Sequence, residues 1–164
     1  MGVFFLAVIV AMNLSLTSPA FQDEKPIRSR YAGSAGVSPP LNWRTPPPDT
    51  KSFALIVHDP DAPSGDWIHW VVFNTPGDAT GFPENVPIKG RLRDGSMQGD
   101  NDSGKSGYSG PTPPSGTHHY IFELYALDTM LPLPPGSSAR SLQMVMRGHI
   151  LAQTQLVGLY SAGG

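Results

Sequence analysis

The chain has 164 residues and a formal net charge of −2, with 18 Gly, 18 Pro and no Cys. This length is enough for one domain with a substantial core. So many Gly and Pro residues exclude a helical bundle or a coiled coil, because both residue types break helix interiors. The small negative charge gives no general affinity for nucleic acid, and the lack of Cys excludes disulfides and thiolate chemistry.

The N-terminal region carries a short apolar segment, Val3 to Val10 (VFFLAVIV), within 20 residues that hold no charged side chain. The segment is too short to span a bilayer, so we predict no integral membrane insertion. It fits the apolar part of a secretory signal, with Ser18-Pro-Ala20 as a cleavage site. We therefore predict that residues 1–20 are a signal peptide of a periplasmic or secreted protein. The alternative is a misassigned start, with Met12 as the first residue of a cytoplasmic chain.

The next elements in chain order are strands separated by loops. Residues 14–18 alternate apolar and polar side chains, as a half-buried strand does. The Pro-rich stretch 32–50 is predicted to be mostly loop. Two compact apolar runs, Ser52 to His58 and Trp67 to Asn74, are predicted to be buried strands, and His118 to Leu127 is a third. Between them, residues 91–117 are expected to form one long loop, which in a compact domain usually carries function.

A helix is predicted after Pro134-Pro-Gly136, with its N-cap at Ser137 or Ser138. Apolar residues follow at spacings of three and four. Gly148 is expected to divide this region into two short helices, the second ending at Gly158. Apolar residues on these helices can support a homodimer. Strands along most of the chain and helix only near its end predict a mainly β protein, an antiparallel β-sandwich with short C-terminal helices.

One motif is rejected. Gly99 to Ser106 matches the phosphate-loop pattern GxxxxGK[ST], but the Gly and Pro residues that follow forbid the helix this chemistry needs. The neighbouring Asp100 and Asp102 would repel phosphate. Asn101-Asp-Ser103 is formally a glycosylation sequon.

Polar side chains occur at the ends of the three strong strands. Asp59-Pro-Asp61-Ala-Pro63 follows the first, and its prolines stiffen the turn. Strand alternation places His69 on one face with Trp67, Val71 and Phe73. In the third strand, the same alternation predicts two faces. One carries His118, Tyr120, Phe122 and Leu124, and the other carries His119, Ile121, Glu123 and Tyr125.

If Asp59, His69, His118 and Tyr120 converge, two imidazoles can hydrogen-bond a small oxyanion while Asp59 holds one imidazole in the right tautomer. Backbone N–H groups near Gly110 would add donors. No Ser residue shows a paired base, so these residues favour binding over catalysis, with no cofactor and no metal.

Ordered motifs along the chain resemble the phosphatidylethanolamine-binding protein family, most closely its bacterial branch, the Raf kinase inhibitor-like proteins of the YbhB/YbcL type. The resemblance covers residues 14–160. It rests on DPDAP at 59–63, HW at 69–70 with Asn74, GYSGP at 107–111, GTHHY at 116–120 and YALD at 125–128, and on SPAF at 18–21, VSPPL at 37–41 with Trp43, and GHIL at 148–151 with Gly158 and Tyr160.

The resemblance implies a β-sandwich with C-terminal helices and a small pocket for phosphate-type anions such as phospholipid head groups. Matched to the motifs, the pocket residues are Asp59, His69 as the partner of Asp59, Gly110, His118 and Tyr120. Asp61, Pro63, Tyr108 and Pro111 belong to the same motifs and are expected to support the pocket.

This chain departs from the family pattern at two positions near the pocket. Ile68 stands where some members have a second His, and His119 stands where many have Arg. The C-terminal segment is also short, so an extra pocket wall found in animal members is expected to be absent. Regulation of a kinase therefore follows from the family name rather than from these residues.

Two alternatives to simple anion binding remain from the sequence. One is a metal-dependent enzyme in which His69, His118 and Asp59 form a site of two histidines and one carboxylate. The other is a protein-interaction module that binds a protein partner through the loop 91–117.

Overall fold

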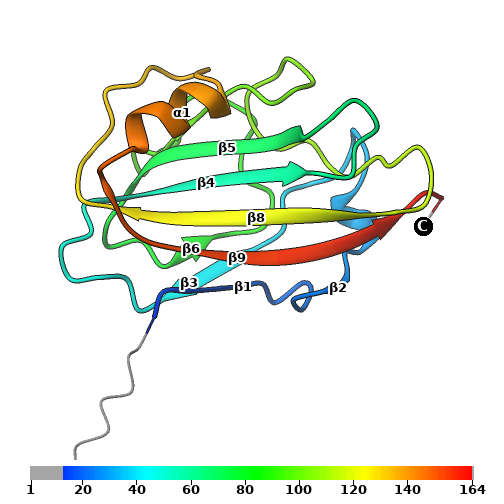
Figure 1. Cartoon of the computed structure of the whole chain (residues 1–164), viewed down its shortest axis with the longest axis horizontal. Helices are drawn as coiled ribbons and strands as arrows, with labels where there is room; N and C mark the ends of the chain where they lie inside the picture. Colours follow the sequence, from blue (N-terminus) through cyan, green and yellow to red (C-terminus); the bar gives the residue numbers. More distant parts are fainter. Residues whose placement is uncertain (1–12, 164) are drawn as a thin grey trace, which may run out of the picture.

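The computed structural model describes residues 13–163, which form two β-sheets, one α-helix and one short 3-10 helix. The apolar run Val3 to Val10 and Met12 lie outside these residues. The larger sheet has the strand order β2-β9-β8-β4-β5-β7 and the smaller one β1-β3-β6 (Figure 1). Neighbouring strands run antiparallel except for the parallel pair β2 and β9. The predicted antiparallel β-sandwich is confirmed.

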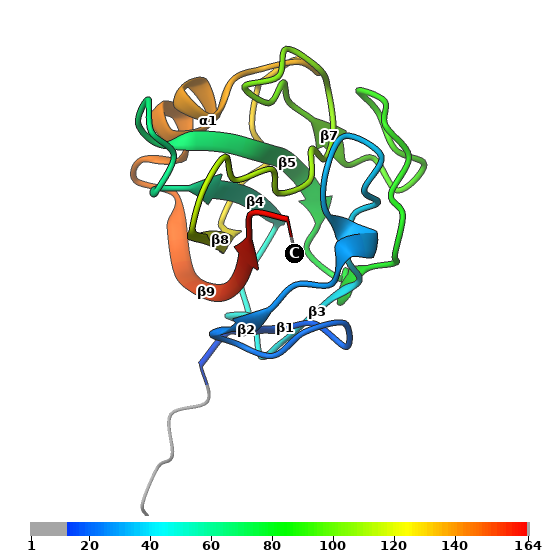
Figure 2. The same ribbon diagram turned by 90° about the vertical axis from the view of Figure 1, so that its right-hand side faces the viewer.

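The larger sheet consists of β2 (Lys25–Pro26), β4 (Ser52–Asp59), β5 (Trp67–Pro76), β7 (Met97–Gln98), β8 (Thr117–Leu127) and β9 (Ile150–Ser161). The smaller sheet consists of β1 (Ser15–Thr17), β3 (Leu41–Arg44) and β6 (Gly81–Phe82). The 3-10 helix is Ser29–Tyr31, and α1 is Ala139–Met146. Figure 2 shows how the larger sheet curves at β9 towards β1 and β3, while α1 covers its other side.

The central strands are apolar along almost their whole length because both faces of the larger sheet are covered. Leu55 and Val57 of β4 point into a core that includes Trp43 of the smaller sheet. Ala54 and Ile56 point the other way, into a second cluster built with Leu142 and Met146 of α1. The strand pattern therefore specifies two layers of packing, one on each side of β4.

The helix α1 begins where the sequence predicts. Ser138 is its N-cap, and its hydroxyl accepts a hydrogen bond from the N–H of Ser141 at 3.1 Å. Leu142 and Met146 are buried against the sheet, and the helix ends before Gly148, whose φ of 79° suits a residue without a side chain.

The second predicted C-terminal helix is wrong, because residues 150–161 form strand β9, which pairs with β8 along its whole length. Gly158 does not end a helix. A Cβ atom there would lie 2.4 Å from Cδ1 of Ile27, so any larger residue would force this buried side chain to move.

The segment 91–117 contains one short strand, β7, and otherwise runs as loop up to Thr117, the first residue of β8. Asn101 holds it together: its side-chain N–H donates to the carbonyl of Gly107 at 2.9 Å, and its Oδ1 accepts the N–H of Ser103 at 2.9 Å. No helix follows Lys105 up to β8, which agrees with the rejected phosphate-loop motif. The amide of the sequon residue Asn101 is buried and already hydrogen-bonded.

Candidate anion-binding site

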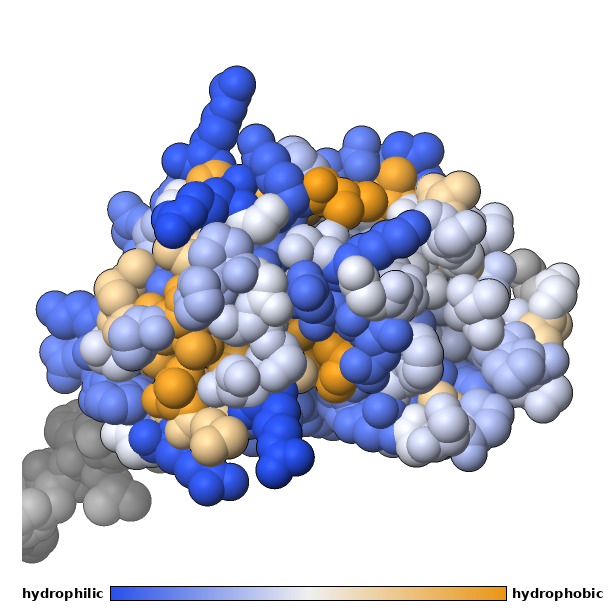
Figure 3. All heavy atoms as spheres, turned by 90° about the horizontal axis from the view of Figure 1, so that it is seen from above, coloured by the Kyte–Doolittle hydropathy of each residue, from blue (hydrophilic) through white to orange (hydrophobic). Residues whose placement is uncertain are grey.

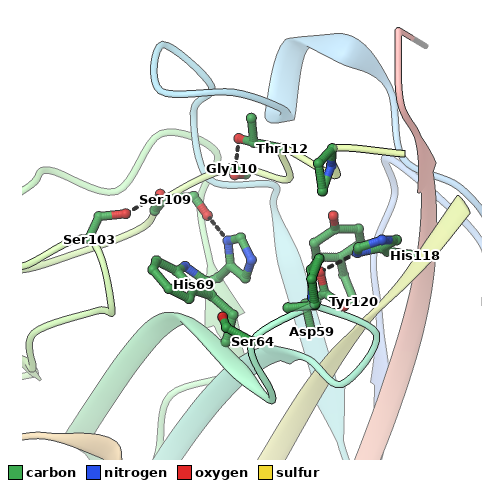
Figure 4. A pocket seen from close by; sticks show the side chains of 13 residues that line it. Asp59, Ser64, His69, Ser103, Ser109, Gly110, Thr112, His118 and Tyr120 are labelled. Carbon is green, nitrogen blue, oxygen red and sulfur yellow. Dashed lines mark hydrogen bonds and ion pairs between the residues drawn. The ribbon is translucent and has the colours of Figure 1, made fainter. Parts of the chain in front are cut away.

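A cavity of about 290 Å³ opens at the end of the larger sheet where β4 ends and where β5 and β8 begin. Antiparallel pairing brings these three strand ends together, and the loop 103–114 closes the fourth side (Figure 4). The lining residues are Asp59, Ala62, Pro63, Ser64, Trp67, His69, Ser103, Ser109, Gly110, Thr112, Pro114, His118 and Tyr120.

Asp59 organises one wall of the cavity through both carboxylate oxygens. Its Oδ2 accepts a hydrogen bond from Nδ1 of His118 at 2.7 Å, and its Oδ1 accepts the N–H of Asp61 at 2.8 Å. Because Nδ1 of His118 donates to a carboxylate, Nε2 is the ring nitrogen left for a ligand. The expectation that His69 partners Asp59 is wrong, since the partner is His118.

His69 reaches the cavity through a β-bulge. Trp70 of β5 pairs with Val57 and Ile68 pairs with His58, so His69 is the extra residue between the two pairs. The bulge turns the side chain towards Tyr120, whose ring lies 5.2 Å from the imidazole at an interplanar angle of 78°.

The predicted common face of His69, Val71 and Phe73 is therefore wrong. Val71 and Phe73 pack in the cluster under α1, whereas His69 lies on the opposite side of the sheet, in the cavity. Strict alternation fails at the bulge because one extra residue reverses the direction of every side chain beyond it.

The hydrogen bonds of His69 also determine its chemistry. Its Nδ1 donates to the carbonyl oxygen of Ser109 at 2.7 Å, which leaves Nε2 for the cavity. Burial lowers the pKa of His69 below its usual value of 6.5, and the Ser109 carbonyl only partly offsets this. At neutral pH Nε2 therefore accepts hydrogen bonds, and after protonation it donates one.

Tyr120 contributes a buried hydroxyl between the two imidazoles. The residue is 1% exposed, and among residues 13–163 its hydroxyl has no hydrogen-bond partner. Burial, and then the negative charge of Asp59, raise the pKa of Tyr120, so the hydroxyl stays protonated. A buried donor without a partner is costly, and an acceptor from a ligand would relieve that cost.

The structure brings together five predicted ligand-binding residues and one supporting residue: Asp59, His69, Gly110, His118, Tyr120 and Pro63. The other supporting residues lie outside the cavity lining. Asp61 accepts hydrogen bonds from the N–H and Nδ1 of His119 at 2.8 and 2.7 Å, and this contact lowers the pKa of Asp61. The hydroxyl of Tyr108 donates to the carbonyl of Tyr31, and the carbonyl of Pro111 accepts the N–H of Gly33.

Gly110 lines the cavity, but its lack of a side chain has a packing cause. A Cβ atom at this position would lie 2.6 Å from the carbonyl oxygen of Tyr31 and 2.7 Å from that of Gly33. Only glycine lets the loop approach the segment 31–33 so closely.

Sequence reasoning did not assign seven lining residues, Ala62, Ser64, Trp67, Ser103, Ser109, Thr112 and Pro114. Two of them had a usable signal: Trp67 was expected on the face of His69, and Ser109 is the neighbour of Gly110. Ser103, Thr112 and Pro114 reach the cavity because the loop 103–114 closes over the strand ends, a tertiary feature without a local pattern, and Ala62 and Ser64 lie in the turn after Asp59.

The geometry gives no support for a metal centre in the described part of the chain. No group of three or more His, Asp or Glu residues is arranged there to hold a metal ion. Both oxygens of Asp59 and both Nδ1 atoms are already engaged within the protein. In the same residues, no helix is long and apolar enough to cross a membrane.

A charged cluster lies beside the cavity, on the face of the sheet that carries α1. Nδ1 of His58 is 2.7 Å from Oδ1 of Asp66, and Nε2 is 3.6 Å from Oε2 of Glu123. Glu123 also accepts a hydrogen bond from the hydroxyl of Tyr125 at 2.8 Å. Glu123, together with Asp66, raises the pKa of His58 to about 8 despite partial burial. Through His58, these contacts connect Asp66, the residue before β5, to Glu123 of β8.

The fold and the cavity together define a class: a β-sandwich with a small polar pocket at the end of its larger sheet. Comparison of the sequence with known families finds a match to the family described as phosphatidylethanolamine-binding protein, over residues 17–161. The chain belongs to this family, and family membership supports a binding-type function.

Relatives from archaea and bacteria share nearly the whole domain. A UPF0098 protein of Methanothermobacter thermautotrophicus is 54% identical over 151 residues, covering 92% of this chain and 100% of the relative. The crystal structure of Escherichia coli YbcL, described as a new member of the mammalian PEBP family, matches with a TM-score of 0.84 and 32% identity, over 92% of this chain and 99% of YbcL. A PEBP homologue from Chlamydia trachomatis matches with a TM-score of 0.82 and 38% identity, over 91% and 97% of the two chains.

Proposed function

We propose that the cavity binds a small phosphate-type anion, either free or as the head group of a phospholipid, and releases it unchanged. The observation that carries this proposal is the hydroxyl of Tyr120, a buried donor at a cavity wall between two imidazoles that has no hydrogen-bond partner within residues 13–163. An anion oxygen is the acceptor that this hydroxyl lacks.

The two histidines suit an anion that brings or shares a proton. Each uses Nδ1 within the protein, so each offers Nε2 to the ligand. A neutral imidazole accepts a hydrogen bond from a phosphate O–H group, and a protonated one donates to a phosphate oxygen. Affinity is expected to fall as the pH rises through the pKa of His69, which burial holds below 6.5, because the imidazole then loses the positive charge that attracts the anion.

The positions of the serine side chains support binding without catalysis. Ser64, Ser103 and Ser109 line the cavity. No hydrogen bond between these hydroxyls and either imidazole occurs in residues 13–163, and the hydroxyls of Ser103 and Ser109 lie 3.4 Å apart. A serine nucleophile needs a base within hydrogen-bond distance.

Titration with inorganic phosphate and with phosphoethanolamine, followed by NMR of the imidazole nitrogens at pH 6.5, tests the proposal. The signals of His69 and His118 are expected to shift at millimolar ligand. The exposed His149, which pairs with Asp128 at 2.8 Å, is the internal control and should not move. Signals of His69 and His118 that stay fixed, or that move no more than that of His149, would contradict the proposal.

Two variants make the test specific. His69→Ala should weaken phosphate binding about tenfold, whereas His149→Ala should bind as the parent chain does. Comparing the two ligands separates the possible sources: equal affinities indicate that phosphate alone is recognised, and tighter binding of phosphoethanolamine indicates recognition of the head group.

A further inference from the structure

A second cavity of about 290 Å³ lies away from the anion site and is lined by the segment 82–94, which leads from β6 towards β7. Phe82, Val86 and Leu92 form its apolar floor, with Pro83 and Pro87 beside them. None of its lining residues belongs to the first cavity. The two sites also differ in chemistry, because the first is lined by imidazoles and hydroxyls and the second mainly by hydrocarbon.

The walls of this groove are held in place by buried and partly buried hydrogen bonds. The side-chain amide of Gln98 donates to the carbonyls of Pro87 and Lys89 at 2.7 and 2.8 Å. The N–H of Val86 donates to Oγ of Ser38 at 2.9 Å. Phe82 is anchored from below by Trp70, at a ring distance of 5.7 Å. A groove that is already formed binds a ligand without a large ordering cost.

The rim of the groove is positively charged although the whole chain has a net charge of −2. Lys89 and Arg93 line it, and Arg91 lies between them in sequence. In residues 13–163 none of these three cations takes part in an ion pair. Among the described residues that line the groove, Asp94 is the acidic one, and its side chain accepts the N–H of Ser96 at 2.8 Å.

The size of the groove suits a small ligand. On the face seen from above, hydrophobic atoms appear in separate small areas bordered by hydrophilic side chains (Figure 3). The volume of the groove, about 290 Å³, lies close to the lower limit of roughly 300 Å³ for pockets that bind small molecules.

From the apolar floor, the preformed walls and the cations that form no ion pair within the described part of the chain, we propose that this groove binds an aliphatic carboxylate of medium chain length. The hydrocarbon chain lies over Phe82, Val86 and Leu92, and the carboxylate lies between Lys89 and Arg93. Apolar contact provides most of the affinity, and charge complementarity selects an anionic ligand over a neutral or cationic one.

Titration of the full chain with decanoate, followed by the methyl signals of Val86 and Leu92, tests this site. Both signals are expected to shift with one common dissociation constant, which should stay within twofold when saturating phosphate is present. Decanol and decyltrimethylammonium should bind at least tenfold more weakly. Equal binding of the three probes, or fixed methyl signals, would overturn the proposal.

A surface double variant tests the role of charge without disturbing the core. Lys89→Ala/Arg93→Ala should weaken decanoate binding at least tenfold and leave phosphate binding unchanged. The matched control Lys25→Ala/Arg140→Ala removes two exposed cations elsewhere and should change neither affinity. Unchanged decanoate binding in the first variant would overturn the proposal even if phosphate binds as expected.

Discussion

Nδ1 of His118 lies 2.7 Å from Oδ2 of Asp59, and the two side chains are only 8% and 5% exposed. The pair joins the end of β4 to the start of β8, which are 59 residues apart in the chain. Because Oδ1 of Asp59 also accepts the N–H of Asp61, one carboxylate fixes both the imidazole and the turn that forms the cavity wall.

Replacing Asp59 by Asn should therefore affect stability and binding together. The amide keeps the size of the carboxylate but loses its charge. Its NH2 group would also face either Nδ1 of His118 or the N–H of Asp61, both of which are donors. We expect a loss of about 2–3 kcal/mol in the free energy of unfolding, as for a buried hydrogen bond to a charged group. Urea denaturation measures the loss, and phosphate titration should show at least tenfold weaker binding. The exposed Asp128→Asn, which also removes a His partner, should change both quantities little.

The sequence predicted the strong strands and most of the cavity because these depend on local patterns. Alternation in β8 correctly places Tyr120, Phe122 and Leu124 in one core, and Tyr125 in the other. The predictions that were wrong concern features that depend on contacts between residues distant in sequence. The bulge that turns His69 into the cavity exists because of the pairing of β5 with β4, and nothing in the order WIHW marks it.

The misassigned C-terminal segment has a different cause. Ala152, Leu156 and Tyr160 contact the core at intervals of four residues. An interval of four fits both the helical period of 3.6 and an even number of strand residues, so the pattern does not discriminate between the two structures. The free edge of β8 decides the outcome by pairing with this segment from Ile150 to Ser161.

Deleting residues 1–20 should destabilise the protein, because the predicted cleavage site lies after β1. Leu14 and Leu16 are 7% and 5% exposed, and Leu16 pairs with Trp43 of β3. Losing two buried leucines is expected to cost about 3–6 kcal/mol. Urea denaturation of a chain that begins at Phe21 measures this loss, and a chain that begins at Asn13 is the matched control. Equal stability of the two chains would show that β1 is dispensable and would leave cleavage after Ala20 compatible with the fold.

His58 should make stability depend on pH above neutrality. Its pKa is about 8 in the folded protein against 6.5 for an ordinary histidine, so the folded state holds the proton more tightly. The resulting stabilisation, about 2 kcal/mol at most, is complete below pH 6.5 and is lost as the pH rises through 8.

Urea denaturation between pH 6 and pH 9 measures this effect. The parent chain should lose stability over that interval, and His58→Gln should give a flatter profile because it cannot titrate. His149→Gln, which removes an exposed histidine with a single carboxylate partner, should keep the slope of the parent chain. An identical slope in His58→Gln would assign the pH dependence to other groups.

Replacing Tyr120 by Phe separates the needs of the fold from those of the ligand. The change removes one buried hydroxyl that has no partner within residues 13–163. The free protein should therefore be at least as stable as the parent, by up to about 1 kcal/mol more, because an unsatisfied buried donor is costly. Phosphate affinity should fall about tenfold, since the anion loses the hydrogen bond that this hydroxyl donates.

Urea denaturation and phosphate titration at pH 6.5 measure the two effects, and Tyr108→Phe is the control because its hydroxyl is already bonded to the carbonyl of Tyr31. That control should lose stability and keep its affinity. A Tyr120→Phe chain that loses stability while binding phosphate normally would place the hydroxyl in the fold rather than in the site.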